Sequence, residues 1–279
     1  MEIAFSKYHG IGNDFVMIAD PDDRLKLDAD TVRALCDRRF GIGGDGVIRV
    51  APGTEGGDFF MDYINSDGSI GEMCGNGIRC LAVFVRDEGL TEATEMQIDT
   101  RAGRKVVTVL DDGRVRVDMG APIFEPSEIP AKAEGEHALR ATIDLDDQKI
   151  DAALVSMGNP HAVIFVSDPA HAPVTKLGPK IETHPMFPNG TNVEFLRVEG
   201  PEHVTMRVWE RGSGETLACG TGAAAVGVVA RLLGDAHEKL TVALPGGDLE
   251  IEWSGSLQER QPVYLTGPAV RSFAGHTEI

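Results

Sequence analysis

The fold is decided by two short stretches, Met73-Cys74-Gly75-Asn76-Gly77 and Ala218-Cys219-Gly220-Thr221-Gly222. Both contain the pattern Cys-Gly-X-Gly, and their cysteines stand 145 residues apart. A run that is apolar around nearly its whole circumference follows each cysteine, over residues 77–88 and 222–233, and this pattern predicts a helix enclosed on all sides. Two enclosed helices, each preceded by the same glycine-flanked cysteine, indicate a duplicated chain.

Other landmarks recur at nearly the same offset, 144 to 147 residues from one half to the other. Among them, a glycine fifteen residues after each cysteine is expected to end the helix. The matched pairs are Gly12-Asn13-Asp14 with Gly158-Asn159-Pro160, Gly89 with Gly234, Arg101-Ala102-Gly103 with Pro245-Gly246-Gly247, and Gly120 with Gly267. An internal repeat therefore organises the whole chain.

Short β-branched runs bounded by turn residues predict strands between these landmarks, at residues 15–18, 106–109, 163–166 and 240–243. We therefore predict an α+β fold of two pseudo-symmetric domains. Each domain is expected to be a curved, barrel-like and mainly antiparallel sheet around its buried central helix. A third, more polar helix is predicted from Asp30 to Arg39, with Asp28 or Asp30 as its N-cap.

The domain boundary is expected near residues 120–130, where the stretch 121–136 is rich in proline and glutamate. The first repeat would then form an N-terminal domain over residues 1–120, and the second a C-terminal domain over residues 121–267. By analogy with the strand expected after Gly120, residues 268–279 are expected to return to the first domain and complete it.

Composition excludes several classes of function. The net charge of −18 comes without a stripe of lysine and arginine, so we expect no nucleic-acid partner. The sequence has neither a secretory pattern at its start nor an apolar stretch long enough to cross a membrane, so we expect a cytoplasmic protein without a membrane partner. The four cysteines form no C-x-x-C pair for zinc, so we expect reduced thiols and no metal.

The two repeated cysteines are well placed for acid-base chemistry. The start of a helix carries free backbone amides and the positive end of the dipole, which lower a thiol pKa and can bind a carboxylate. Two such sites facing one cleft would set Cys74 and Cys219 on opposite sides of one carbon, where one removes a proton and the other delivers one. Cys36 and Cys80 have no counterpart in the repeat, so we expect them to be structural.

Four motifs carry a resemblance that spans essentially the whole chain: MCGNGIRC, GNPHAV, NVEF and ERGSGETLACGTG. Together they resemble the diaminopimelate epimerase family. The resemblance implies an isomerase that needs no cofactor, pyridoxal phosphate included, and that interconverts LL- and meso-2,6-diaminopimelate in lysine and cell-wall precursor biosynthesis. It also implies a homodimer whose partner molecule is this small substrate.

The same resemblance implies roles for individual residues, beginning with Cys74 and Cys219 as the two catalytic bases. The implied substrate-binding residues are Asn13, Asn65, Gly75, Asn76, Asn159, Asn192, Glu210, Arg211, Gly220 and Thr221. His161 and Glu210 are expected to tune the thiol pKa values. From the residues alone, each asparagine fits equally well as a turn residue, His161 as a structural residue, and Glu210-Arg211 as a solvated pair.

Two other functions fit the same thiols. One is a proline or hydroxyproline racemase, which an assay with both substrates would separate. The other is a non-catalytic redox-sensing or metal-binding protein, which zinc titration of the thiols would reveal. Residues 41–46 match G-x-G-x-x-G, but a helical segment precedes them, so a dinucleotide site is not expected. Gly46 stands where some family members carry glutamine, so it is left out of the site.

Overall fold

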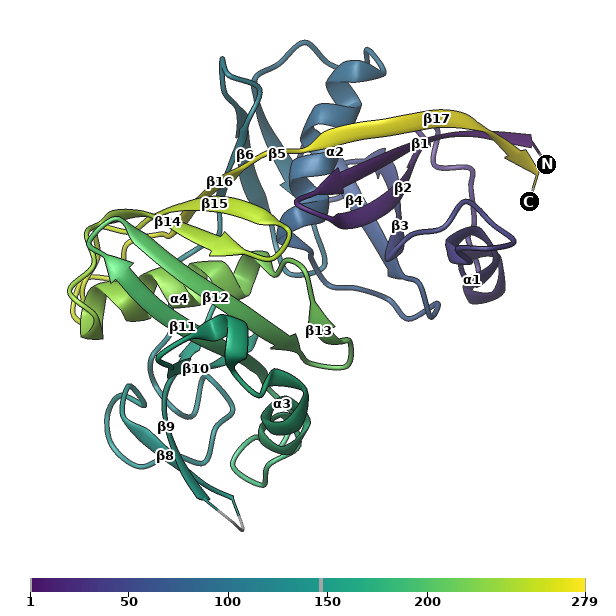
Figure 1. Cartoon of the computed structure of the whole chain (residues 1–279). Helices are drawn as coiled ribbons and strands as arrows, with labels where there is room; N and C mark the ends of the chain where they lie inside the picture. Colours follow the sequence, from purple (N-terminus) through teal and green to yellow (C-terminus); the bar gives the residue numbers. More distant parts are fainter. Residues whose placement is uncertain (1, 146–147, 279) are drawn as a thin grey trace. The chain divides into compact units, whose positions relative to one another are not determined.

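The computed structural model describes residues 2–145 and 148–278. The chain divides into two compact units (Figure 1): unit 1 is Met1–Asp118 with Thr266–Ile279, and unit 2 is Met119–Leu265. Strands far outnumber helices in both units, and the predicted α+β class is confirmed. Within the described residues, no helix combines the length and the apolar character needed to cross a membrane.

Unit 1 is a mixed sheet with two helices. Its elements are β1 (Glu2–Gly10), β2 (Asn13–Ala19), α1 (Ala29–Cys36), β3 (Gly46–Pro52), β4 (Phe59–Asn65), α2 (Gly75–Asp87), β5 (Glu95–Asp99), β6 (Lys105–Val109), β7 (Val115–Asp118) and β17 (Val270–Glu278). The strands neighbour each other in the order β17-β1-β2-β3-β4-β5-β6-β7. The pairs β2–β3 and β4–β5 are parallel, and the other pairs are antiparallel.

Unit 2 repeats this plan. Its elements are β8 (Ala141–Leu145), β9 (Gln148–Ser156), β10 (Pro160–Phe165), η1 (Pro169–His171), α3 (Val174–Glu182), β11 (Asn192–Gly200), β12 (His203–Glu210), β13 (Gly214–Thr216), α4 (Gly220–Leu233), β14 (Lys239–Leu244) and β15 (Gly247–Glu252), and β16 (Tyr264–Gly267) crosses the boundary. The strand order is β8-β9-β10-β11-β12-β14-β15, with the short β13 also on β12. Here β10–β11 and β12–β14 are the parallel pairs.

The strand registers confirm the internal repeat. In unit 1, Phe15 of β2 lies opposite Gly46 of β3. In unit 2, His161 of β10 lies opposite Asn192 of β11, at the same offset of 146 residues. The four sequence-predicted strands lie within or across β2, β6, β10 and β14. Equivalent positions can therefore be compared residue by residue between the units.

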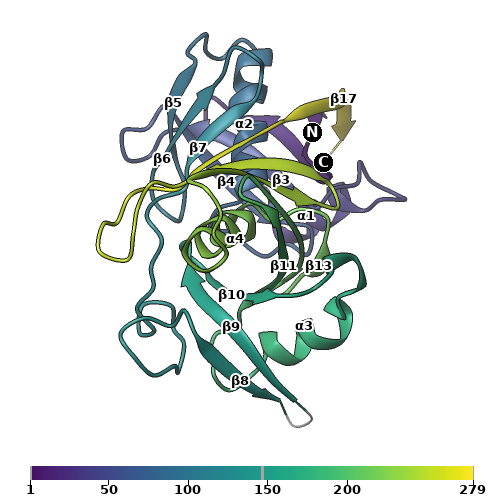
Figure 2. The ribbon, with the colours of Figure 1, turned by 60° about the vertical axis from the view of Figure 1, so that its left-hand side comes forward.

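The two predicted central helices are present, and both begin two residues earlier than expected. Cys74 is the N-cap of α2 and Cys219 is the N-cap of α4, each with an extended backbone. Ten residues of each helix are buried. Helix α2 packs on β1, β2, β6 and β7, and Figure 2 shows α4 with β9, β10 and β11 around it. The chain therefore presents each cysteine at the first turn of an enclosed helix.

The ends of the three predicted helices differ in detail. Gly89 follows α2 with a left-handed φ of 68°, as expected for a terminating glycine. Gly234 is the C-cap of α4, but its φ is −121° and the left-handed residue is Asp235. The polar helix begins at the predicted N-cap, Asp28, but ends at Cys36 instead of Arg39, because the Asp37 side chain accepts hydrogen bonds from the backbone amides of Arg39 and Phe40.

Candidate active site

Cys74 lies half-buried at the start of α2, beside the start of β2. Its thiol donates to Asn13 Oδ1 at 3.5 Å. The Nδ2 of Asn76, in the first turn of α2, donates to the same oxygen at 3.1 Å. The structure therefore brings three of the sequence-predicted site residues of unit 1 together around one sulfur.

Two further residues fix the orientation of these amides. Asp45 accepts from Asn13 Nδ2 at 2.7 Å, so the oxygen of that amide must face Cys74. Arg79 donates to Asn76 Oδ1 at 2.9 Å, so the nitrogen of that amide must face Asn13. Neither Asp45 nor Arg79 was among the predicted site residues. A chain of hydrogen bonds thus runs from the buried guanidinium of Arg79 through Asn76 and Asn13 to the Asp45 carboxylate. The Cys74 sulfur contacts this chain at Asn13.

Asn65 lies at the end of β4, and its Nδ2 donates to Ser69 Oγ at 3.0 Å. Among the described residues, it forms no hydrogen bond with the group around Cys74. Gly46 pairs with Asn65 across β3 and β4. A Cβ at Gly46 would lie 2.6 Å from the Ile64 carbonyl oxygen and 2.7 Å from Tyr63 Cε2, so no side chain fits there. The omission of Gly46 from the predicted site agrees with this packing.

Cys219 is buried at the start of α4, where its Sγ accepts from the Gly222 amide at 3.3 Å. The Thr221 hydroxyl lies 3.6 Å from the same sulfur. Glu210, at the end of β12, accepts a hydrogen bond from the Thr216 hydroxyl, and its carboxyl group lies close enough to Cys219 to act on the sulfur electrostatically. The sulfur of unit 2 is therefore held between a helix end and a carboxyl group.

The electrostatics of Cys219 contradict the expectation that a helix start lowers the thiol pKa. Burial, followed by the nearby carboxylates of Glu210 and Glu194, raises the pKa of Cys219 well above its ordinary value. The Thr221 hydroxyl and the Gly222 amide oppose this rise but do not overcome it. Burial also raises the pKa of Glu210. This pair therefore retains its protons to higher pH than the same groups would in water.

His161 and Glu194 form a buried pair on the neighbouring parallel strands β10 and β11. His161 Nδ1 lies 2.6 Å from Glu194 Oε1, and neither side chain is exposed to solvent. His161 Nε2 lies 3.0 Å from Asn159 Oδ1, an oxygen that can only accept, so Nε2 carries a hydrogen. Asn159 Nδ2 then donates to the Thr221 hydroxyl at 3.3 Å. This network connects the buried pair to the hydroxyl beside Cys219.

The second Oε of Glu194 is buried and makes no hydrogen bond within the described part of the chain. Glu194 was quoted within the NVEF motif but was not predicted as a site residue. A charged residue inside the buried first half of β11 is the signal that could have identified it. It lies close enough to Cys219 to act on the sulfur electrostatically.

The side chain of Asn192 contacts the backbone of Arg211, not its guanidinium. Asn192 Oδ1 accepts from the Arg211 amide at 2.9 Å, and Asn192 Nδ2 donates to the Pro160 carbonyl oxygen at 2.9 Å. The Arg211 guanidinium donates to the Asn189 carbonyl oxygen at 3.2 Å and is exposed. The structure therefore leaves Arg211 accessible to a solute anion, with its backbone fixed by Asn192.

Close packing explains why the residue that follows X in each Cys-Gly-X-Gly pattern, Gly77 or Gly222, has no side chain. A Cβ at Gly222 would lie 2.8 Å from Glu194 Oε1 and 3.2 Å from Cys219 Sγ. A Cβ at Gly77 would lie 2.7 Å from Ile48 Cδ1. The first turns of α2 and α4 contain Gly75, Asn76, Gly220 and Thr221, and their amide hydrogens have no preceding turn of the helix to accept them. Both helix starts can thus bind an anion next to the sulfur.

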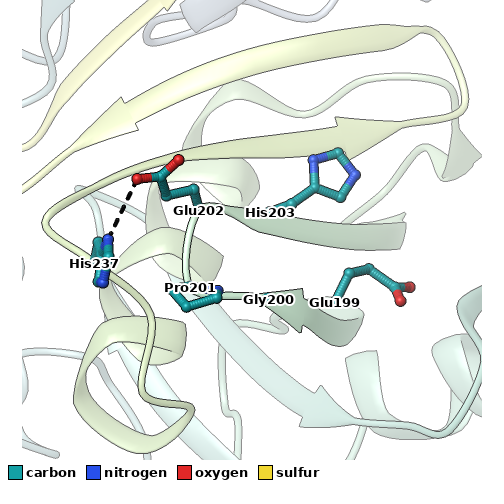
Figure 3. A pocket seen from close by; sticks show the side chains of 6 residues that line it. All are labelled: Glu199, Gly200, Pro201, Glu202, His203 and His237. Carbon is teal, nitrogen blue, oxygen red and sulfur yellow. Dashed lines mark ion pairs between the residues drawn. The ribbon is translucent and has the colours of Figure 1, made fainter.

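The remaining cysteines and a surface pocket lie outside these groups. Burial raises the pKa of Cys36 to about 11 and that of Cys80 to about 12, which fits the predicted structural role. Among the described residues, no group of three or more His, Cys, Asp or Glu side chains could hold a metal ion. Figure 3 shows a pocket of about 340 Å³ in unit 2, lined by Glu199, Gly200, Pro201, Glu202, His203 and His237. It lies at the far end of β11, about 26 Å along the strand from Asn192.

Comparison with known proteins assigns the family. The family model described as diaminopimelate epimerase matches residues 5–125 and 153–272. This chain belongs to the diaminopimelate epimerase family. The family member of that name from Moorella thermoacetica is 49% identical over 276 residues, which cover 97% of this chain and 98% of the relative. The member from Synechococcus elongatus is 45% identical over 282 residues, covering 100% and 99%.

Solved structures with low sequence identity share the fold. A Bacillus anthracis phenazine biosynthesis protein of the PhzF family has a TM-score of 0.73 at 17% identity and covers all of both chains. A probable proline racemase from Agrobacterium radiobacter has a TM-score of 0.70 at 17% identity and covers 99% of this chain and 93% of its own. Membership in the diaminopimelate epimerase family classes the chain as an isomerase, an epimerase, as the sequence motifs predicted.

Proposed function

We propose that the chain interconverts LL- and meso-2,6-diaminopimelate by a two-base mechanism that uses Cys74 and Cys219. The observation that carries the proposal is that both cysteines are N-caps of enclosed helices at equivalent positions of an internal repeat, in a chain of this family. One sulfur, as thiolate, removes the α-hydrogen from one face of the substrate. The other, as thiol, delivers a proton to the opposite face, so the configuration at the α-carbon is inverted.

The backbone amides at the starts of α2 and α4 supply the main stabilisation in this mechanism. Removal of the α-hydrogen moves negative charge onto the reacting carboxylate, which becomes enolate-like. The amides of Gly75-Asn76 and Gly220-Thr221 donate to that carboxylate and stabilise the charge as it develops. Donors that are already fixed in place need no reorganisation during the reaction, so they contribute without an added coenzyme.

The remaining polar residues bind the distal half of the substrate. Amide oxygens of Asn13, Asn65, Asn159 and Asn192 and the carboxylate of Glu210 accept from ammonium groups, and the exposed guanidinium of Arg211 binds a carboxylate in bidentate geometry. Binding of this distal amino-acid group supplies the energy that orients the α-carbon. His161 and Glu210 adjust the proton affinity of the thiols.

As part of this proposal, the enzyme requires neither pyridoxal phosphate nor a metal and acts in lysine and cell-wall precursor biosynthesis. It works as a homodimer in the cytoplasm. Its two folding domains divide at residues 120 and 267, and residues 268–279 complete the first domain. Sedimentation of the pure protein at two concentrations tests the dimer separately from the activity.

The activity is tested by incubating pure, reduced protein with LL-diaminopimelate in heavy water without added cofactor. Proton NMR should show the meso isomer forming, with deuterium entering at the α-carbon that is inverted. Proline and hydroxyproline in parallel samples serve as the matched controls and should remain unchanged. Inversion of proline but not of diaminopimelate would reject the substrate assignment, and no inversion of any of the three would reject the enzyme class.

A further inference from the structure

Glu194 is a carboxylate in the buried first half of β11, and its side chain is not exposed to solvent. Its Oε1 lies 2.6 Å from His161 Nδ1, and its Oε2 makes no hydrogen bond within the described part of the chain. A Cβ at Gly222 would lie 2.8 Å from Oε1, so the carboxylate packs against the first turn of α4. A buried carboxylate is strongly unfavourable unless a positive group balances it.

The His161 ring is the group that can balance this charge. Within residues 2–145 and 148–278, no lysine or arginine forms an ion pair with Glu194. The ring faces an acceptor at each nitrogen, the carboxylate at Nδ1 and the Asn159 amide oxygen at Nε2. A ring that donates from both nitrogens is an imidazolium. The two side chains therefore form a buried ion pair with no net charge.

Two other ionisable groups act on this pair. Glu210, on the neighbouring strand β12, interacts electrostatically with both Glu194 and His161, and burial raises the pKa of Glu210. Cys219 is affected by Glu194, and burial raises the pKa of that thiol well above its ordinary value. Because both groups hold their protons more strongly than they would in water, they do not compete for the imidazolium. Glu194 is also the carboxylate that hydrogen-bonds the ring.

The ring sets the direction of a chain of hydrogen bonds that ends at Cys219. Its Nε2 donates to Asn159 Oδ1 at 3.0 Å, so the nitrogen of that amide turns to the Thr221 hydroxyl at 3.3 Å. The hydroxyl oxygen accepts there, and its own hydrogen is available to the Cys219 sulfur 3.6 Å away. The Gly222 amide donates to the same sulfur at 3.3 Å. The sulfur therefore has one backbone donor and one hydroxyl donor.

The opposite direction of this chain differs by one hydrogen. A neutral ring that donates to the carboxylate through Nδ1 has a bare Nε2, which accepts from the Asn159 amide nitrogen. The amide oxygen then faces Thr221, whose hydroxyl donates to it and turns away from Cys219. The two orientations of an asparagine amide have the same shape. The charge on the ring, and not packing, therefore decides which way the hydroxyl points.

Unit 1 lacks the ion pair, and its asparagine has the opposite orientation. Phe15 and Ile48 occupy the positions equivalent to the histidine and the glutamate. Asn13 is the counterpart of Asn159, and its oxygen accepts from Asn76 Nδ2 at the start of α2, because a carboxylate takes its nitrogen on the other side. The repeated asparagine thus presents an oxygen to the helix start in unit 1 and a nitrogen in unit 2.

We propose that Glu194 is a positioning residue that holds His161 as an imidazolium. Through this ring, the Asn159 amide is oriented so that the Thr221 hydroxyl directs its hydrogen to the Cys219 sulfur. A fixed hydroxyl donor stabilises the sulfur in the steps in which it carries negative charge, whichever way the reaction runs. This role deepens the proposed function and rests on it, since the sulfur concerned is one that reacts with the α-carbon.

The test is the number of hydrogens on the His161 ring in the full-length protein without substrate. Protein labelled with nitrogen-15 histidine is measured by long-range proton–nitrogen NMR, and His161→Phe identifies the signals of this ring. An ordinary histidine, with a pKa of about 6.5, has one bare ring nitrogen at about pH 8. His161 should instead show hydrogens on both nitrogens at that pH. A bare nitrogen would overturn the proposal, whether or not the protein epimerises diaminopimelate.

Glu194→Gln assigns the ring charge to the carboxylate. Because glutamine carries no charge to balance the imidazolium, the ring in this variant should have one bare nitrogen at the same pH. Glu199→Gln is the matched control, since it removes an exposed carboxylate from the other end of β11 and should leave both ring hydrogens in place. An unchanged ring in folded Glu194→Gln protein would overturn the proposal. If that variant does not fold, the wild-type ring still decides.

A double-mutant cycle connects the carboxylate to the hydroxyl. Glu194→Gln and Thr221→Val should each lower kcat about tenfold, the effect of one hydrogen bond to a charged group. Because both changes remove the same donor, the double variant should be no slower than either single variant. Losses that multiply to about a hundredfold would contradict action through Thr221. A wild-type protein that shows the charged ring but no epimerisation would reject the proposed function and leave the ion pair standing.

Discussion

The two units share one strand order and one helix but differ at the positions that surround each cysteine. Phe15 of unit 1 corresponds to His161 of unit 2, and the strand registers opposite Gly46 and Asn192 place them at equivalent points. Two residues further along these partner strands, Ile48 corresponds to Glu194. Duplication has therefore preserved the frame while the side chains around the two sulfurs have diverged.

The difference between the units is one of charge. In unit 1, the hydrogen-bonded asparagines beside Cys74 connect to the buried cation Arg79 at one end and to the carboxylate of Asp45 at the other, whereas unit 2 places two carboxylates and a histidine near Cys219. A symmetric pair of thiols would share one proton evenly between them. A pair with opposite surroundings has a defined resting state, and a two-base mechanism needs one thiol and one thiolate.

Replacing either cysteine should give the largest effect. Cys74→Ser and Cys219→Ser should each lower kcat for epimerisation about 10³-fold, the contribution expected from a positioned acid-base group, because a hydroxyl is a far weaker acid than a thiol. Measurement of kcat in both directions checks this. Cys36→Ser, which alters a buried thiol outside the site, is the control and should retain activity. Strong activity in either catalytic variant would remove that sulfur from the mechanism.

Glu210→Gln tests the charge around Cys219 and should lower kcat about 10²-fold. Since the Glu210 carboxylate raises the pKa of Cys219, its removal should shift that pKa downward, although burial will still hold it above the ordinary value. The basic limb of the kcat/KM profile should therefore move to lower pH. Glu215→Gln, a surface change on the adjacent β13, should leave the profile in place. A basic limb that moves upward would contradict the assigned sign.

Gly222→Ala tests the packing of the second glycine. The new methyl group would meet Glu194 Oε1 at 2.8 Å and the Cys219 sulfur at 3.2 Å, so the free energy of unfolding should fall by about 1–3 kcal/mol. Urea unfolding measures the change. Gly200→Ala, where a Cβ would meet nothing within 4 Å, is the matched control in the same unit. Equal stability of the two variants would show that α4 shifts freely and that the glycine has another role.

Asp45→Asn should have the smallest effect, because Asp45 contacts Asn13, and only Asn13 contacts the Cys74 sulfur directly. An asparagine can present its own nitrogen to Asn13 and allow that amide to turn, so KM should rise a few-fold with a smaller change in kcat. Steady-state kinetics separate the two constants. Asp67→Asn, on the exposed turn after β4, controls for loss of one acidic charge. A large loss of kcat with KM unchanged would mean that Asp45 acts in the chemical step.

The sequence predicts the frame of this molecule well because the frame depends on local patterns. The enclosed helices follow from apolar runs after Cys74 and Cys219, and the repeat follows from glycines at fixed spacing. The end of α1 was predicted too late because the capping of the following amides by Asp37 is a side-chain effect that periodicity does not report. Local pattern thus predicts which elements exist better than where they end.

The charged residues around each sulfur were harder to predict, because their contacts join distant parts of the chain. Asp45, which comes just before β3, accepts a hydrogen bond from Asn13 at the start of the neighbouring strand β2. Glu194 on β11 contacts His161 on the parallel neighbour β10. Arg79 and Glu194 nevertheless leave a trace in the sequence, since each is a lone charge within a run that is otherwise buried. A buried charge needs a reason, and that reason can be sought before a structure is known.

The central claim, that two different groups handle the proton on the two faces of the α-carbon, is tested most directly by the early isotope pattern. LL-diaminopimelate is incubated with the enzyme in heavy water, and both isomers are recovered after a small fraction has reacted. Two monoprotic bases predict that the meso product carries solvent deuterium at the inverted carbon while the remaining LL substrate carries almost none. Product that retains the hydrogen of the substrate would show that a single base carries the proton from one face to the other.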